Sequence, residues 1–222
     1  MDPGQPGAAH DRGQWCRCAF DYTIDGDLRY ISHRDTLRMF RRALARAGLP
    51  VRFTEGFNPH PRIMIPLPRP VGVASEAETI VVEFEEPIDA DGALDRLDRE
   101  TPADLRMVSV RLLQPKEQLR PTQARYCLDV GHSRLADLDA RIRRVIKADV
   151  LEVERPILKS KRTRTVDIRP YLLDIRVDGD AIEYTLRVTG TGTARPAEVA
   201  GLLGYDANAI NHRIRRIEVR WQ

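Results

Sequence analysis

Two closely spaced prolines flank a histidine and follow an asparagine in the segment from Gly56 to Arg62, which reads GFNPHPR. Proline fixes its own backbone and restricts the residue before it, so this loop should be stiff. Asn58, His60 and Arg62 could converge on an anion or a base edge, and His60 could exchange a proton near neutral pH. A rigid turn in which Asn58 caps backbone groups and His60 packs is the alternative. We favour a binding site here.

A second candidate begins at Ser32, where the sequence Ser-His-Arg-Asp predicts the start of a helix. Serine followed three residues later by an acid resembles a capping box. Helix N-termini bind anions through free backbone N–H groups, and His33 and Arg34 would add donors there. Simple capping is an equally weighted alternative. His33 and His60 are candidate catalytic residues, as an acid–base pair only if the fold brings them together.

The predicted helix over residues 33–47 separates apolar residues from arginines, which fall on opposite faces. A face this one-sided could contact nucleic-acid phosphates, although most such faces are simply solvated. Its arginines are Arg34, Arg38, Arg41, Arg42 and Arg46.

A second basic group lies at a predicted strand connection in the second half of the chain. Phosphate contact is one interpretation, and a solvated hairpin tip is the other. Its cations are Lys159, Lys161, Arg162 and Arg164.

A glycine-rich stretch from Gly190 to Thr193 follows a predicted strand and precedes a predicted helix. Backbone N–H groups in such a place could cradle a phosphate. The stretch lacks the Lys-Ser/Thr ending of a P-loop, so it does not indicate nucleotide hydrolysis. An ordinary turn is the simpler interpretation.

Two predicted strands place charged residues by alternation. The acidic residues of the strand over residues 78–85 are expected to face solvent, Glu78 among them. In the last strand, Arg213 and Arg215 should lie on one face and Arg216 and Arg220 on the other, so that only part of this group can join one basic patch.

The order of predicted elements repeats in the two halves of the chain. Each half reads approximately β-α-β-β-α-β, so we predict an α+β protein of two tandem ferredoxin-like halves. A single α+β domain with one continuous sheet is the alternative. The predicted parts are a disordered tail over residues 1–13, a first half over 14–113, a linker over 114–123 and a second half over 124–222.

The composition limits the classes of function. Formal net charge is +3, and 32 of the 36 basic residues are arginine, which grips phosphate bidentately but is also enriched by GC-rich codon usage. The sequence has neither an apolar run of membrane-spanning length nor a signal-peptide pattern, so we expect a cytoplasmic protein without a membrane partner. Three cysteines argue against a disulfide scaffold, a zinc site or an iron–sulfur cluster, and no cofactor is expected.

The segments ISHRDTLRMFRRALARAGLP and GFNPHPRI, within residues 29–70, resemble the radical-SAM-associated domain of unknown function. The likeness continues through residues 70–76 and, more loosely, 166–170. It implies a standalone form that works beside a radical SAM protein and is linked to RNA processing or modification. No Cys-x-x-x-Cys-x-x-Cys motif is present, so radical chemistry would belong to the partner. The resemblance carries over no catalytic residues.

A looser, architectural likeness is to the CRISPR repeat-processing endoribonucleases, which also pair two ferredoxin-like halves. Residues 190–195 and His33 resemble the glycine-rich loop and the histidine of that family.

These observations predict an RNA-binding accessory module that presents a structured RNA, such as a tRNA or rRNA, to a separate radical SAM enzyme. Whether the chain is itself an enzyme stays open. One alternative is a metal-independent endoribonuclease that uses His33 or His60. The other is a protein–protein adaptor without RNA binding.

Overall fold

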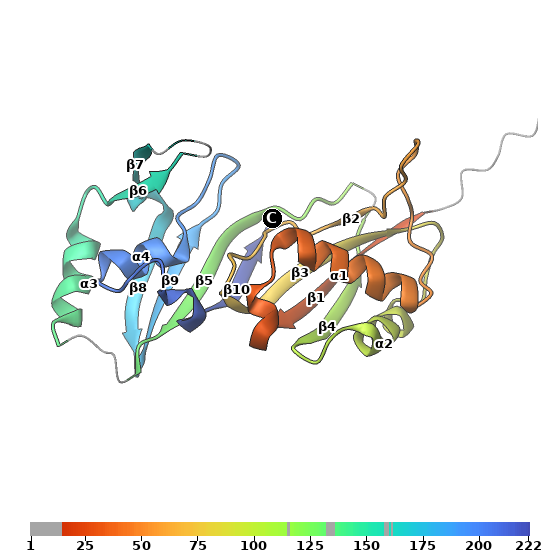
Figure 1. Cartoon of the computed structure of the whole chain (residues 1–222), viewed down its shortest axis with the longest axis horizontal. Coiled ribbons are helices and arrows are strands. Elements are labelled where there is room, and N and C mark those ends of the chain that lie inside the picture. The colour runs from red at the N-terminus through yellow and green to blue at the C-terminus, as the bar shows by residue number, and fades with distance from the viewer. Residues whose placement is uncertain (1–14, 115, 132–135, 158–159, 161) are drawn as a thin grey trace, which may run out of the picture.

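The computed structural model describes residues 15–114, 116–131, 136–157, 160 and 162–222. Its main feature is an eight-stranded sheet in the order β4-β1-β3-β10-β5-β9-β8, with the short strand β2 paired to β3 (Figure 1). The mixed α+β fold is therefore confirmed. The predicted disordered tail, residues 1–13, lies outside the described residues, as do Lys159 and Lys161.

The first half of the chain supplies four strands and two α-helices. They are β1 (Cys16–Ile24), α1 (His33–Arg46), β2 (Ile63–Met64), β3 (Ala74–Phe84), α2 (Ala90–Glu100) and β4 (Leu105–Leu112), with the 3-10 helix η1 (Gly26–Tyr30) before α1. β1 lies between β3 and β4 and is antiparallel to both.

Local sequence signals explain where α1 begins and ends. The Ser32 hydroxyl accepts a hydrogen bond from the Asp35 N–H at 3.2 Å, as the capping pattern predicts. Gly48 follows the helix with φ +60°, a left-handed conformation that glycine adopts without a side-chain clash. Phe40 and Leu44 of α1 are buried against alternate residues of β1 and β3, so the apolar face predicted for this helix is its packing face.

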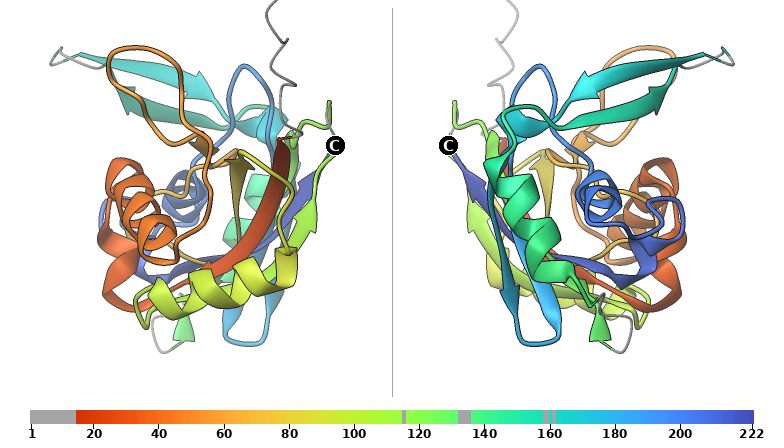
Figure 2. Two further views of the ribbon diagram at one scale, coloured as in Figure 1. Left: turned by 90° about the vertical axis from the view of Figure 1, so that its right-hand side faces the viewer. Right: turned by 90° about the vertical axis from the view of Figure 1, so that its left-hand side faces the viewer.

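The second half adds the other main-sheet strands, a separate hairpin and two α-helices. They are β5 (Pro121–Asp129), α3 (Leu138–Lys147), β6 (Glu152–Pro156), β7 (Thr163–Asp167), β8 (Leu172–Asp178), β9 (Ala181–Arg187), α4 (Pro196–Leu202) and β10 (Ile214–Trp221), with the 3-10 helices η3 (Arg169–Tyr171) and η4 (Ile210–Arg213). β6 and β7 pair only with each other, and their hairpin stands out from the body of the protein (Figure 2). β5 begins at Pro121, within the stretch predicted as a linker.

The two halves meet where β3 and β10 run parallel, with only Ala74 and Ser75 paired to Arg215 and Arg216. The side chains of Arg216 and Glu78 are 1% and 2% exposed and form an ion pair at 2.7 Å. Arg216 also donates to the backbone oxygens of Leu67 at 3.0 Å and Pro68 at 3.3 Å.

The prediction that Glu78 faces solvent is therefore wrong. Along β3, Glu78 has the same parity as the core residues Ile80 and Val82, so its side chain points to the covered face. Burial works to lower the pKa of Arg216, but the charge of Glu78 and the contact with Tyr126 outweigh it, so the pKa is raised and the guanidinium stays charged. The junction between the halves is thus closed around a buried ion pair.

No helix in the described part of the chain has the length and apolar character needed to cross a membrane. Nor do the described residues contain a group of three or more His, Cys, Asp and Glu placed to hold a metal ion.

Candidate nucleic-acid interface

All five arginines on the outer face of α1 are exposed. Arg38 pairs with Asp35 at 3.0 Å, and Arg46 pairs with Glu100 at 2.7 Å. Arg34, Arg41 and Arg42 form no ion pair with another described residue. Three guanidinium groups on one helix face are therefore free to bind anions.

A groove of about 390 Å³ runs beside α1. Its apolar lining comes from η1, α1 and the turn before β4, and its polar lining comes from α1 alone. The apolar residues are Leu28, Ile31, Met39 and Pro102, and the polar ones are Asp35, Arg38, Arg42 and Arg46. An apolar floor beside cations suits a flat aromatic group that carries negative charge.

The loop over residues 51–62, here the first arm, projects from the body of the protein (Figures 1 and 2). The Thr54 N–H donates to the His60 carbonyl at 2.9 Å, and the His60 N–H donates to the Thr54 hydroxyl at 3.0 Å, so these two hydrogen bonds close the arm. Asn58 and His60 are exposed near its tip, where the Phe57 side chain is fully exposed as well. Arg62, in contrast, lies at the base of the arm, 3.5 Å from the Glu83 carboxylate.

Asn58, His60 and Arg62, all of them described residues, therefore do not come together at one site. Phe57 is the feature that the sequence interpretation overlooked. An aromatic residue inside a polar, proline-rich turn was the signal that could have revealed it, because such a side chain has little core to pack against.

The β6–β7 hairpin, here the second arm, carries Arg162 and Arg164 as exposed side chains. Neither forms an ion pair with another described residue. Both arms project on the same side of the molecule, the upper side in Figures 1 and 2, and they lie well apart along its long axis. Both views of Figure 2 show the second arm extending towards the side on which α1 lies.

His33 lies away from the first arm, beside the junction of the two halves. It lines a cavity of about 10 Å³ with Tyr22, Arg69 and Glu78 among its neighbours. Burial, and then the nearby charge of Glu78, raise the pKa of Tyr22 well above its usual value. A space of this size holds about one water molecule, so a nucleotide could not enter it without rearrangement. Nothing in the described residues joins His33 to His60.

The Gly190–Thr193 stretch forms a closed turn. The Gly192 N–H donates to the Thr189 carbonyl at 3.2 Å and to the Thr189 hydroxyl at 3.1 Å. Since this amide already has partners, it is not a free donor for a phosphate, and the turn interpretation fits better.

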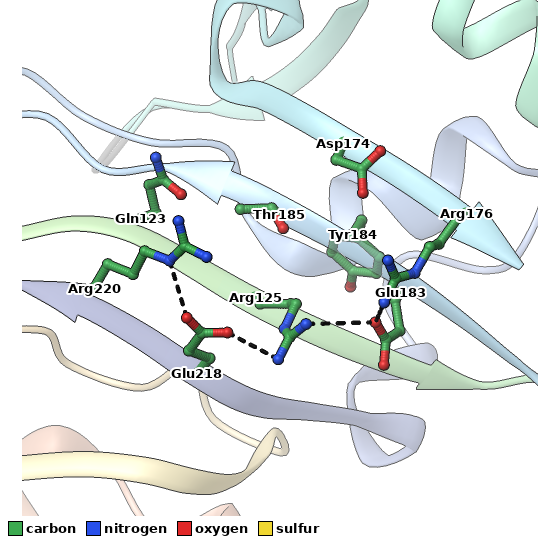
Figure 3. A pocket seen from close by; sticks show the side chains of 9 residues that line it. All are labelled: Gln123, Arg125, Asp174, Arg176, Glu183, Tyr184, Thr185, Glu218 and Arg220. Carbon is green, nitrogen blue, oxygen red and sulfur yellow. Dashed lines mark hydrogen bonds and ion pairs between the residues drawn. The ribbon is translucent and has the colours of Figure 1, made fainter. Parts of the chain in front are cut away.

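Another hollow, of about 190 Å³, is lined by side chains of β5, β8, β9 and β10 (Figure 3). Arg125 lies between Glu218 at 2.8 Å and Glu183 at 3.9 Å. Arg176 and Arg220 pair with these same two carboxylates. Because every arginine in this hollow already has a carboxylate partner, it is a weaker candidate for phosphate than the α1 face.

Comparison with known families gives a match that covers most of the chain. Residues 17–196 match a family described as an uncharacterized protein conserved in bacteria, DUF2344. No curated protein matches the sequence.

Proposed function

The chain belongs to the DUF2344 family, and we propose that it is an RNA-binding module whose contact surface is formed by α1 and the two arms. The observation that carries the proposal is the exposed set of Arg34, Arg41 and Arg42 on one helix face, which form no ion pair within the part of the chain that the structure describes. Arginine binds phosphate bidentately and stacks on bases, so such a face suits a nucleic-acid backbone.

Two further features, the exposed Phe57 ring and the apolar groove beside α1, favour RNA with unpaired bases over a regular duplex. Single-stranded loops present bases that can stack on exposed aromatic side chains. Phe57 offers such a side chain at the tip of the first arm. The groove beside α1 offers an apolar floor next to Arg42. A looped RNA could place phosphates on α1 and unpaired bases on these two features.

Within this proposal, each half is a ferredoxin-like unit. The strand order supports it. When the main-sheet strands of each half are numbered along the chain, both halves have the order fourth, first, third, second: β4-β1-β3-β2 in the first half and β10-β5-β9-β8 in the second. The second half differs by the inserted β6–β7 hairpin. The first arm follows α1, and the second arm follows α3. Each of these is the first α-helix of its half, so the two arms occupy corresponding positions in the chain.

The module would present its RNA to a separate radical SAM enzyme. This part of the proposal rests on the resemblance carried by residues 29–70, and on the lack of a cluster-binding cysteine motif in this sequence. The reaction would then take place on the partner, and this chain would supply binding and orientation.

Fluorescence anisotropy with labelled tRNA, a single-stranded oligoribonucleotide and duplex DNA tests the RNA-binding claim. If Arg34, Arg41, Arg42, Arg162 and Arg164 each neutralise one phosphate, the logarithm of the association constant should fall with the logarithm of salt concentration with a slope of about −4. We expect the RNAs with unpaired bases to bind more tightly than the duplex. Absence of binding to both RNAs at low salt would contradict the proposal and favour the adaptor alternative.

A further inference from the structure

Three arginines surround one carboxylate at the base of the first arm. The Glu83 carboxylate lies 4.0 Å from Arg17 Nε, 3.8 Å from Arg52 Nη1 and 3.5 Å from Arg62 Nη1. The four side chains are between 14% and 37% exposed, so water screens them only in part. Arg52 also lies over the Trp15 ring, 5.1 Å from its centroid.

These contacts leave hydrogen-bonding groups unused. Arg17 Nε, Arg62 Nε and Glu83 Oε2 are buried atoms without a hydrogen-bond partner among the described residues. Buried polar atoms of this kind normally have partners, and leaving them unpaired is unfavourable. Three guanidinium groups therefore hold one carboxylate loosely, at ion-pair rather than hydrogen-bond distance.

The neighbouring carboxylate does not restore the balance. Glu117 accepts from Arg111 at 2.6 Å and from the Gln114 N–H at 3.0 Å, while Arg17 donates to its backbone oxygen at 2.8 Å. Counting Arg111 and Glu117, the cluster holds four guanidinium groups and two carboxylates, an excess of two positive charges.

The backbone fixes this cluster in place. The Arg52 N–H donates to the Glu83 carbonyl at 2.8 Å, and the Glu83 N–H donates to the Arg62 carbonyl at 3.0 Å. The two chain segments at the base of the arm are thus hydrogen-bonded to the end of β3. The cluster is organised before any ligand arrives, which lowers the entropic cost of binding.

We propose that Arg17, Arg52 and Arg62 form a binding site for a phosphoryl group, with Glu83 holding the guanidinium groups together in its absence. A phosphate supplies several acceptor oxygens and a charge that matches the excess. The inference does not depend on RNA binding by α1. In this proposal Arg62 acts together with Arg17 and Arg52 at the base of the arm, and not with Asn58 and His60 at the tip.

Trp15 reports on this site, because a ligand that moves Arg52 changes the environment of the ring. In a Trp221→Phe background, Trp15 is the only tryptophan. Inorganic phosphate, titrated against chloride at constant ionic strength, should change its fluorescence saturably. Glu83→Gln removes the competing carboxylate and should tighten phosphate binding about ten-fold or more. Glu100→Gln, which removes the same charge beside Arg46, should leave phosphate affinity unchanged.

Three results would overturn the site: no saturable response in either the parent or Glu83→Gln, an equal response to chloride, or a response that survives Arg52→Gln/Arg62→Gln. A 5′-hydroxyl oligouridylate, which contains only phosphodiesters, separates the sources of phosphate. If the oligouridylate changes the Trp15 fluorescence and added inorganic phosphate reverses that change, the site binds an RNA backbone. If only inorganic phosphate changes the fluorescence, the site binds a free or terminal phosphate. Charge reversal on α1 should leave the phosphate response intact, so failure of one proposal is distinguishable from failure of the other.

Discussion

Glu78→Gln should destabilise the protein by about 3–5 kcal/mol, because it leaves the Arg216 charge buried without its carboxylate. Arg216→Met should cost a similar amount, since it leaves Glu78 buried and removes the donor to the Leu67 and Pro68 carbonyls. The double variant should be less destabilised than the sum of the two, because neither charge is then left unpaired. Chemical denaturation measures all three free energies of unfolding.

The matched control is Glu76→Gln. Glu76 pairs with Arg215 at the same junction at 3.5 Å, but the two side chains are 53% and 36% exposed. Exposed pairs contribute about 1 kcal/mol or less, so this variant should change stability little. Equal effects at Glu76 and Glu78 would show that the buried pair has no special role in joining the halves.

The same variants test whether the junction couples the two halves. Trp15 precedes β1 in the first half, so it reports on that half. Trp221 ends β10 and packs against Ala19, Val81 and Leu113 of the first half, so it reports on the contact between the halves. With the ion pair intact, both probes should give one transition. In Glu78→Gln we expect the two transitions to separate, because the β3–β10 pairing alone is short.

Reversing three charges on α1, in Arg34→Glu/Arg41→Glu/Arg42→Glu, should weaken RNA binding about a hundred-fold or more at low salt. The salt slope should also become shallower by about two to three, because three phosphate contacts are lost. All three side chains are exposed and unpaired among the described residues, so the fold should tolerate the change. Anisotropy across a salt series measures both quantities.

Arg143→Glu/Arg144→Glu/Lys147→Glu on α3 is the control. It changes the net charge by the same amount at exposed positions of another helix. If both triple variants weaken binding equally, the effect is one of total charge and α1 is not the contact surface. If neither weakens it, RNA binds elsewhere.

Some of this arrangement could be predicted from sequence because its causes are local. The start of α1 follows from Ser32 and Asp35, and its end from Gly48. The exposure of the α1 arginines follows from helical periodicity, since Phe40 and Leu44 fix the buried face.

Other features depend on residues that are distant in sequence. Glu78 and Arg216 are 138 positions apart, and only the pairing of β3 with β10 brings them together. Strand parity does indicate that Glu78 points inward, but not which cation meets it. Arg62 is a similar case: it belongs to a proline-rich loop by sequence, yet its side chain turns to Glu83 on β3.

Crosslinking in the native cell, with identification of both the bound RNA and the crosslinked peptides, tests whether α1 and the two arms contact RNA. We expect one enriched RNA, with crosslinks on α1 and on both arms, Phe57 included. A radical SAM protein recovered from the same sample would support the presenting role. Recovery of a protein partner without enriched RNA, or crosslinks confined to the sheet face around Arg125, would show that α1 and the arms are not an RNA-binding surface.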